Sequence, residues 1–314
     1  MTSAVTPQTF TQYSRMFDRY STFCIQLQLR IWPASEDKLI LFCTFLSRSV
    51  QHSTIRAYLS GIRFFAILHG RPFSIIGMER LYYVLRGIKR LYTVHRLPRA
   101  PITPAHLVQI HTQLQLPGST RLDGALYWAA CNLAYFGLLR VSEYTCSRIN
   151  SYNPDIHLLV SDITVSCRHI TVLIKASKTD PFRQGCHIRI APSYTDFCPV
   201  LAIQHYLRIR PFRVSAPLFI FDNGTFLTRL DVSLLLQRSL PNSVNINTHS
   251  FRIGGASATA SAGVSDSVIK ILGRWSSDAY KRYIRVSDSI LRAWSVNIAN
   301  VDSLTVFWDF ENPK

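Results

Sequence analysis

A run of small residues constrains the fold of this chain more than any other stretch. From His249 to Ala262 the sequence reads HSFRIGGASATASA, in which Gly, Ala and Ser predominate after Arg252. A helix with so few bulky side chains can pack very close to a neighbouring element. His249 and Arg252 then lie at its N-terminal end, where free backbone N–H groups and the helix dipole attract anions.

The segment after this helix adds further residues that can do chemistry. Gly273, Arg274 and Trp275 form a GRW turn, and Tyr283 lies in the basic run KRYIR. The region 248–285 therefore holds a nucleophile candidate, a proton-transfer candidate and an anion clamp. What it can do depends on the groups that the rest of the chain contributes.

The overall charge narrows the class of partner. The 314 residues include 35 Lys and Arg against 18 Asp and Glu, a net charge of +17. Most of the cations are Arg, whose planar fork suits phosphate, so we expect nucleic acid as the partner. No stretch reaches the length of a membrane span, and no membrane partner is expected. Seven scattered Cys without a CxxC pair argue against a disulfide framework or zinc site and for a reducing compartment.

Residues 1–97 are predicted to form a separate helical domain. Their apolar spacing is helical throughout, and the three prolines of LPRAPITP at 97–104 mark a linker before residues 98–314. The first domain has 13 Lys and Arg against 4 Asp and Glu, which favours a DNA-binding role over an ordinary solvated surface. The cations expected to line two helix faces are Arg56, Arg63, Arg86, Lys89 and Arg90.

Residues 98–314 combine helices with strands. An apolar helix at 121–145 ends near Arg140, which either binds an anion or forms a structural pair with Glu143. Residues 158–191 have strand character, and Lys178 lies in the turn between the last two strands. Such a Lys is commonly a solvated residue, and its functional alternative is a proton donor to a phosphate. The predicted fold class is mainly α with a small antiparallel β-sheet.

Six residues of this domain have the chemistry of phosphodiester transfer: Arg140, Lys178, His249, Arg252, Trp275 and Tyr283. A Tyr phenol that attacks a phosphodiester forms a phosphotyrosyl bond and splits strand exchange into two steps. Two Arg forks stabilise the extra charge of the transition state. A Lys can protonate the leaving 5′ hydroxyl, and a His can relay the Tyr proton. This chemistry requires no metal and no cofactor.

From about residue 100 to 290 the sequence resembles the tyrosine recombinase, or phage integrase-like, family. The resemblance rests on five motifs in the family's order: GLLRVSE, KASKTD, THSFR, LGRW and YIR. It implies that the six residues form one active site, that Tyr283 makes a 3′-phosphotyrosyl intermediate, and that Glu143 supports Arg140. Trp275 occupies the position at which many members have a second His, and its indole N–H can still donate to the phosphate.

Two positions leave alternatives open. Members usually place the Tyr nine residues after the His or Trp, whereas Tyr283 follows Trp275 by eight, and Tyr280 is a competitor. Lys175 likewise competes with Lys178 as the hairpin Lys. We favour Tyr283, because its YIR context matches, and Lys178, because it lies in the turn.

The resemblance also implies an architecture and a setting. A helical, SAM-like core-binding domain at 1–97 and an α+β catalytic domain at 98–314 would clamp double-stranded DNA, with four protomers on two duplexes. GRWSSDAYKRYIR is most similar to recombinases of the eukaryotic Crypton and DIRS mobile elements, which implies integration or excision in the nucleus; a bacterial integrase would act at the nucleoid. The aromatic tail either caps its own domain or anchors a neighbouring subunit: Trp294, Phe307, Trp308 and Phe310.

Two other functions share parts of this evidence. A type IB topoisomerase-like enzyme uses the same chemistry as a monomer, with little sequence preference. A domesticated DNA-binding protein would need the basic surface but not Tyr283 and Lys178 together, so the complete set of six residues favours catalysis.

Overall fold

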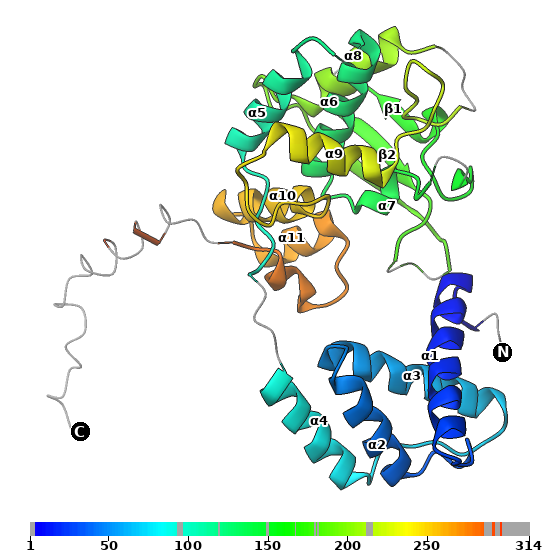
Figure 1. The fold of residues 1–314 in the computed structure, drawn as a ribbon. Coiled ribbons are helices and arrows are strands. Elements are labelled where there is room, and N and C mark those ends of the chain that lie inside the picture. Colours follow the sequence, from blue (N-terminus) through cyan, green and yellow to red (C-terminus); the bar gives the residue numbers. More distant parts are fainter. Residues whose placement is uncertain are drawn as a thin grey trace, which may run out of the picture. The chain divides into compact units, whose positions relative to one another are not determined.

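The chain forms two compact units, Met1–Leu97 and Pro98–Lys314. The computed structural model in Figure 1 describes residues 4–92, 97–118, 120–148, 151–166, 168–178, 180, 182–211, 216–285, 291, 292 and 296. The aromatic residues expected to form a C-terminal cap or anchor lie outside this set, and that expectation stays a prediction.

The first unit consists of helices around an aromatic core. Its helices are α1 (Pro7–Gln26), α2 (Glu36–Ser47), α3 (His52–Leu68) and α4 (Glu79–Tyr92). The hydroxyl of Thr6 accepts the Thr9 N–H, and Pro7 follows in the first turn, where its missing N–H costs nothing, so α1 begins there. Tyr20 and Phe42 are fully buried in the core between the helices.

The second unit contains the remaining elements. They are α5 (Pro104–Leu114), α6 (Arg121–Phe136), α7 (Val141–Tyr144), η3 (Val160–Asp162), β1 (Ile163–Val165), β2 (Ile170–Ile174), β3 (Cys186–Ile190), α8 (Pro199–Ile209), α9 (Arg229–Ser239), α10 (Ser250–Ser261), α11 (Asp266–Gly273) and η4 (Asp278–Arg282). The strands form an antiparallel sheet in the order β1-β2-β3, with Val172 opposite both Ile163 and Ile188. The predicted fold class, mainly α with a small antiparallel sheet, is confirmed.

Helix α6 is the centre of the second unit because it is apolar on every side. Most of its side chains are buried, and it packs against α5, α8 and α10. Thr120 caps its first turn through the Asp123 N–H, and its last turn leads into the segment that carries Arg140. The position of α6 therefore fixes one half of the site described below.

Helix α10 packs against α6 at backbone distance, as its small residues predict. A Cβ at Gly255 would lie 2.2 Å from the carbonyl oxygen of Tyr135 in α6. A Cβ at Gly254 would lie 2.0 Å from the carbonyl oxygen of Ile102. Only glycine permits both contacts, and they bring the N-terminal end of α10 beside the end of α6.

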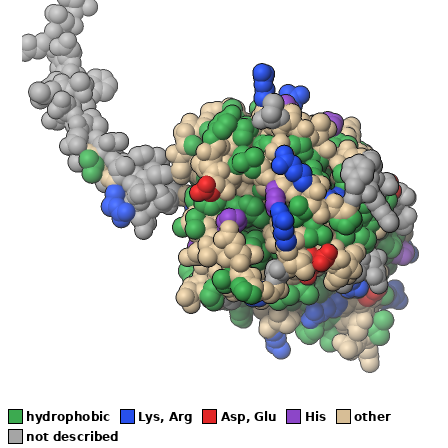
Figure 2. Space-filling view, turned by 90° about the horizontal axis from the view of Figure 1, so that it is seen from above, with side chains coloured by type: hydrophobic (Ala, Val, Ile, Leu, Met, Phe, Trp, Pro, Cys, Tyr) green, Lys and Arg blue, Asp and Glu red, His purple; other side chains and the backbone are tan. Residues whose placement is uncertain are grey.

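The charged surface of the chain is mainly basic. On the face in Figure 2, Lys and Arg side chains are interspersed with hydrophobic and uncharged ones, and acidic side chains are few. None of the helices in the described part of the chain combines the length and the hydropathy that a membrane span needs.

Candidate active site

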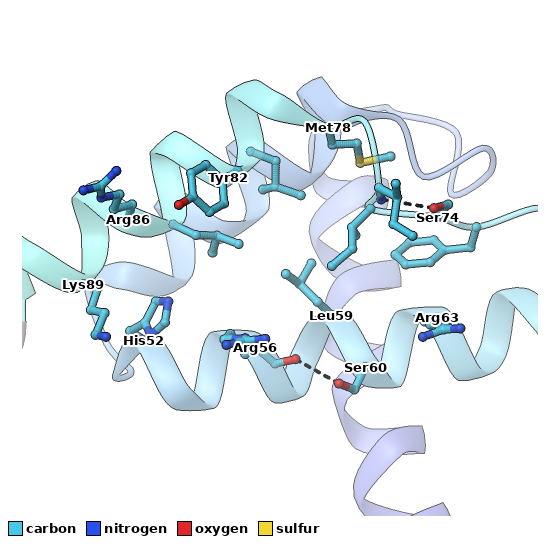
Figure 3. A pocket seen from close by; sticks show the side chains of 15 residues that line it. His52, Arg56, Leu59, Ser60, Arg63, Ser74, Met78, Tyr82, Arg86 and Lys89 are labelled. Carbon is cyan, nitrogen blue, oxygen red and sulfur yellow. Dashed lines mark hydrogen bonds between the residues drawn. The ribbon is translucent and has the colours of Figure 1, made fainter.

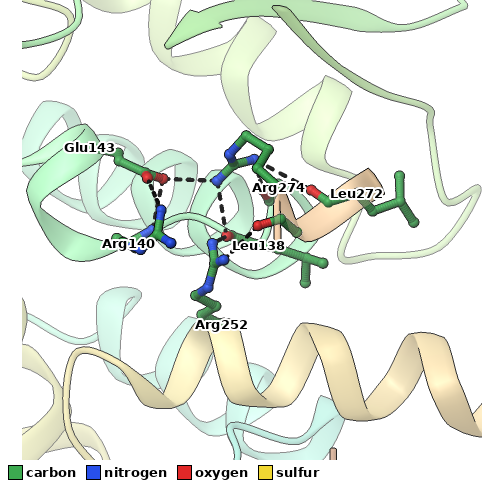
Figure 4. Close-up of polar contacts among 8 residues, drawn as sticks. Leu138, Arg140, Glu143, Arg252, Leu272 and Arg274 are labelled. Carbon is green, nitrogen blue, oxygen red and sulfur yellow. Dashed lines mark hydrogen bonds and ion pairs between the residues drawn. The ribbon is translucent and has the colours of Figure 1, made fainter. Parts of the chain in front are cut away.

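A buried carboxylate organises the polar centre of the second unit (Figure 4). Glu143, on α7, is 2% exposed. Its Oε1 accepts a hydrogen bond from Arg140 Nη1 at 2.9 Å, and its Oε2 accepts from the Arg140 backbone N–H at 2.9 Å. Arg274 Nη2 donates to the same Oε2 at 2.8 Å. The carboxylate therefore holds two guanidinium groups from distant parts of the sequence.

Arg252 brings a third guanidinium to this centre from α10. Its side chain is fully buried, Nη1 donates to the Leu138 carbonyl, and Nη2 donates to the Gly273 carbonyl. Burial and the charges of Arg140 and Arg274 lower the pKa of Arg252. We call Arg140, Arg252, Arg274 and Glu143 the arginine cluster. Three guanidinium groups face one carboxylate, so the cluster has an excess of positive charge that favours an anion.

Trp275 lies over the Arg252 guanidinium. The distance from the Arg252 Cζ to the Trp275 ring centroid is 4.3 Å, and Trp275 is 8% exposed. A Cβ at Gly273 would lie 1.6 Å from the indole ring, so only glycine lets the ring fold back in this way. The buried indole N–H has no hydrogen-bond partner among the described residues. A buried unpaired donor is unfavourable, so this N–H is suited to a ligand acceptor.

Tyr283 completes the group. Its ring centroid lies 5.1 Å from that of His249 and 5.0 Å from that of Trp275, and the Arg252 Cζ lies 5.5 Å from it. The residue is half-buried, and no described residue hydrogen-bonds to its hydroxyl. The 3₁₀ helix η4 ends directly before Tyr283. The spacing of eight residues from Trp275 is therefore compatible with a Tyr in the site.

Ser257 holds the backbone directly after this Tyr. Its hydroxyl donates to the Tyr283 carbonyl at 3.1 Å and accepts from the Arg285 N–H at 2.9 Å. Ser257 lies on α10, two turns after the start of the helix that also carries Arg252. The segment with Tyr283 is thus attached to the same helix as the guanidinium that faces it.

Tyr280, the competitor, has a structural environment. It is 1% exposed, and its hydroxyl donates to the Asp266 carboxylate. That hydrogen bond, together with desolvation, raises the pKa of Tyr280 to about 12. Lys270 lies 5.2 Å from its ring. A buried phenol held by a carboxylate is a poor nucleophile, so the geometry favours Tyr283.

His249 lies at the N-cap of α10 and is neutral at physiological pH. Burial lowers its pKa to about 4, with further contributions from the positive charges of Arg99, Arg252, Arg140 and Arg229. A neutral imidazole can accept a proton from a phenol beside it. A bound phosphate would offset part of the positive charge and raise the pKa of His249.

The two lysines differ in their surroundings. Lys175 Nζ pairs with Asp162 at 2.6 Å and donates to the Pro154 carbonyl at 2.6 Å, so it is occupied in the structure. Lys178 is exposed in the segment between β2 and β3, and no described residue of the arginine cluster contacts it. The structure therefore brings together Arg140, His249, Arg252, Trp275 and Tyr283, with Glu143, but not Lys178.

Arg274 belongs to this centre although the sequence analysis treated it only as part of a turn. Its backbone has the left-handed conformation, with φ 56° and ψ 45°, at the C-cap of α11. This conformation costs a non-glycine residue about 1 kcal/mol. The signal was available in the sequence: an Arg occupies the position after a helix at which Gly or Asn is usual.

Four of the five predicted basic residues of the first unit line a groove between α3 and α4 (Figure 3). The groove has a volume of about 660 Å³ and an apolar floor that includes Phe73 and Met78. None of the described residues that line it is acidic. Its cationic side chains and histidine are His52, Arg56, Arg63, Arg86 and Lys89. Arg90, predicted with them, is exposed on α4 and does not line the groove.

Comparisons with known proteins give matches in structure but not in sequence. No protein-family model and no curated protein matches the sequence. The integrase of the transposon Tn1549, solved with circular intermediate DNA, is 15% identical with a TM-score of 0.57, and the match covers 93% of this chain and 94% of that one. The chain has the tyrosine recombinase fold.

Two further structures with this tyrosine recombinase fold extend over nearly the whole chain. The site-specific recombinase XerH, in a post-cleavage complex with palindromic difH, is 13% identical with a TM-score of 0.60, over 93% of this chain and 79% of that one. A lambda integrase dimer on a COC′ core site is 15% identical with a TM-score of 0.57, over 90% and 89%. At these identities the comparisons establish the fold alone.

Within the described residues, no three His, Cys, Asp or Glu side chains lie together in a way that could hold a metal ion.

Proposed function

We propose that the protein is a DNA strand-exchange enzyme with Tyr283 as its nucleophile. The observation that carries this proposal is the half-buried Tyr283 ring packed against His249, Trp275 and Arg252 beside a cluster with excess positive charge. The Tyr283 oxygen attacks the scissile phosphorus, the bond to the 5′ oxygen breaks, and a 3′-phosphotyrosyl bond forms. Attack by a 5′ hydroxyl reverses the step, and one ester replaces another each time.

The charge of the cluster matches the charge that develops during this transfer. A phosphodiester carries one negative charge and its pentavalent transition state carries more. After Glu143 is counted, three guanidinium groups leave two positive charges. The Arg140 and Arg252 guanidinium groups bind the phosphate, and the unpaired Trp275 N–H donates to one of its oxygens. These interactions strengthen as charge accumulates, so they stabilise the transition state more than the substrate.

Two proton transfers accompany the exchange. His249, neutral because of its low pKa, accepts the phenolic proton of Tyr283. Lys178 donates a proton to the leaving 5′ oxygen. This role requires the segment between β2 and β3 to bring Lys178 to the phosphate when DNA is bound, and Lys175 is disfavoured for it by its pair with Asp162.

The biological setting is part of the proposal. Structures with this fold include a transposon integrase and a lambda integrase, each on DNA, which supports integration or excision of a mobile element. Action in the nucleus, by a tetramer on two duplexes, is proposed from the resemblance to Crypton and DIRS recombinases alone. The basic groove of the first unit is proposed to contact the DNA backbone. Loss of Arg56 or Arg63 should then lower the slope of log Kd against log salt by about 1 each.

The test is covalent trapping on a nicked suicide substrate, from which the leaving strand diffuses away. Wild type should give a protein–DNA adduct, and Tyr283→Phe should bind the DNA but give none. Tyr280→Phe is the matched control and should still form the adduct. An adduct in Tyr283→Phe would refute the assignment. Relaxation of any supercoiled plasmid without strand exchange would indicate a topoisomerase-like enzyme instead.

A further inference from the structure

The Arg274 guanidinium donates its hydrogen bonds to acceptors within the protein. Nη1 donates to the carbonyls of Gly137 at 3.2 Å and Leu272 at 3.4 Å. Nη2 donates to the Leu138 carbonyl at 3.2 Å and to Glu143 Oε2 at 2.8 Å. Nε is buried without a partner among the described residues. A side chain bonded in this way has little left for a substrate phosphate.

The acceptors that Arg274 uses are also those of the two anion-binding arginines. Glu143 accepts from Arg140 through Oε1 and from Arg274 through Oε2. The Leu138 carbonyl accepts from both Arg252 and Arg274. Among the three arginines of the cluster, Arg274 thus shares one acceptor with Arg140 and another with Arg252.

The backbone around Arg274 is arranged for this contact. Arg274 and Leu138 both have positive φ, 56° and 48°, although neither is glycine. The carbonyls of Gly137 and Leu138 follow the C-terminal end of α6, where the helix dipole favours a cation. Arg274 therefore joins the end of α11 to the end of α6, which are far apart in the sequence.

We propose that Arg274 is a positioning residue that holds the Arg140 and Arg252 guanidinium groups at the spacing that one phosphate requires. The inference rests on the proposed function. With Arg274 bound to Oε2, Glu143 offers Arg140 a carboxylate of fixed orientation. With Arg274 on the Leu138 carbonyl, the acceptor of Arg252 is fixed as well. Without it, both clamps keep their charge but lose their relative position.

A purely structural helix cap is the alternative, and Arg274→Gly separates the two. Glycine adopts the left-handed conformation without strain, so this variant removes the guanidinium and relaxes the backbone. Arg183→Gly is the matched control for the backbone effect, because Arg183 is also left-handed (φ 53°) but exposed. The difference in unfolding midpoint between the two variants reports what the Arg274 side chain contributes to stability.

The deciding experiment measures DNA affinity and the single-turnover rate of adduct formation at saturating suicide substrate. For Arg274→Gly we expect a rate about 100-fold lower, the usual effect of a small misplacement, with Kd changed by less than about 3-fold. Guanidinium chloride at non-denaturing concentration should restore part of the rate. Arg274→Lys keeps the charge without the fork and should fall between wild type and Arg274→Gly.

Other results would overturn the proposal. A wild-type rate in Arg274→Gly would mean that the clamps hold their positions without it. A loss of DNA affinity (a higher Kd) together with a lower rate, without rescue by guanidinium and in proportion to lost folded protein, would indicate a cap only. If Arg274→Gly does not fold, the same comparison is made with Arg274→Lys. Failure of the proposed function is distinguishable, because it would appear in the wild-type protein as no adduct, or as an adduct that does not depend on Tyr283.

Discussion

Replacement of Glu143 by Gln tests how much of the second unit depends on one carboxylate. The Glu143 side chain is 1% exposed, and its partners Arg140 and Arg274 are 14% and 12% exposed. Glutamine keeps the shape but removes the charge and turns an NH₂ group toward donors. Breaking a buried ion pair costs about 3–5 kcal/mol, and the slight exposure of both arginines places the expected loss near the lower value. A loss of about 3 kcal/mol raises the unfolded fraction roughly 100-fold.

Native-state hydrogen exchange of the full chain is a suitable assay, because it reports each unit separately. Amides of α6 and α10 should exchange faster in Glu143→Gln, whereas those of α1 and α3 should not change. Asp278→Asn is the control: Asp278 is 61% exposed, so its pairs with Lys270 and Lys281 are screened by solvent and the exchange of α6 and α10 should not change.

Added anion provides a second reading of the same variant. Without Glu143 the cluster carries three positive charges, so sulfate should protect the variant more than it protects wild type. A loss below about 1 kcal/mol for Glu143→Gln, or equal protection by sulfate, would refute the view that this carboxylate balances the cluster.

Three further predictions concern stability. The fold resists protonation of His249 (pKa about 4), whereas the unfolded chain takes up the proton near pH 6.5. Stability should therefore fall as the pH drops between these values, by about 2 kcal/mol at pH 5, and His249→Gln should remove that part of the dependence in urea titrations. Gly255→Ala should destabilise by about 3 kcal/mol, because its Cβ meets the backbone of α6, whereas Gly87→Ala, with open space, should stabilise by about 0.5–1 kcal/mol in the same titrations. Lys175→Ala should cost about 3 kcal/mol, because it leaves the buried Asp162 carboxylate without a cation and with only the Leu159 N–H as donor, and Lys178→Ala should lie within about 0.5 kcal/mol of wild type in thermal melts.

Local sequence patterns were sufficient for much of this fold. The small residues around Gly255 predict the close packing of α10, because only their size permits it. The alternating pattern of Ile170, Val172 and Ile174 predicts a strand with one buried face, and it is buried as expected. In each case the physical requirement lies within a few residues, so the sequence displays it directly.

Contacts between distant segments could not be read in the same way. Arg274 donates a hydrogen bond to Glu143 across 131 residues of sequence, and no pattern near either residue predicts the other as its partner. Tyr280 and Tyr283 have similar sequence surroundings, and tertiary contacts separate them: Asp266 binds the Tyr280 hydroxyl from α11, whereas the Tyr283 ring packs against His249. The order of the motifs identified the candidate residues of the site. It could not distinguish side chains that face a substrate from side chains that position other members of the site.

The two hydrogen bonds of Ser257 have a consequence for the position of Tyr283. One hydroxyl, in one rotamer, holds the two peptide groups on either side of Ile284, directly after Tyr283. Rotation of the Ser257 side chain would release both peptide groups, whereas Arg252 on the same helix keeps its own hydrogen bonds to the Leu138 and Gly273 carbonyls. Under the proposed function, the position of Tyr283 and the position of the phosphate-binding Arg252 are then set by separate side chains of one helix.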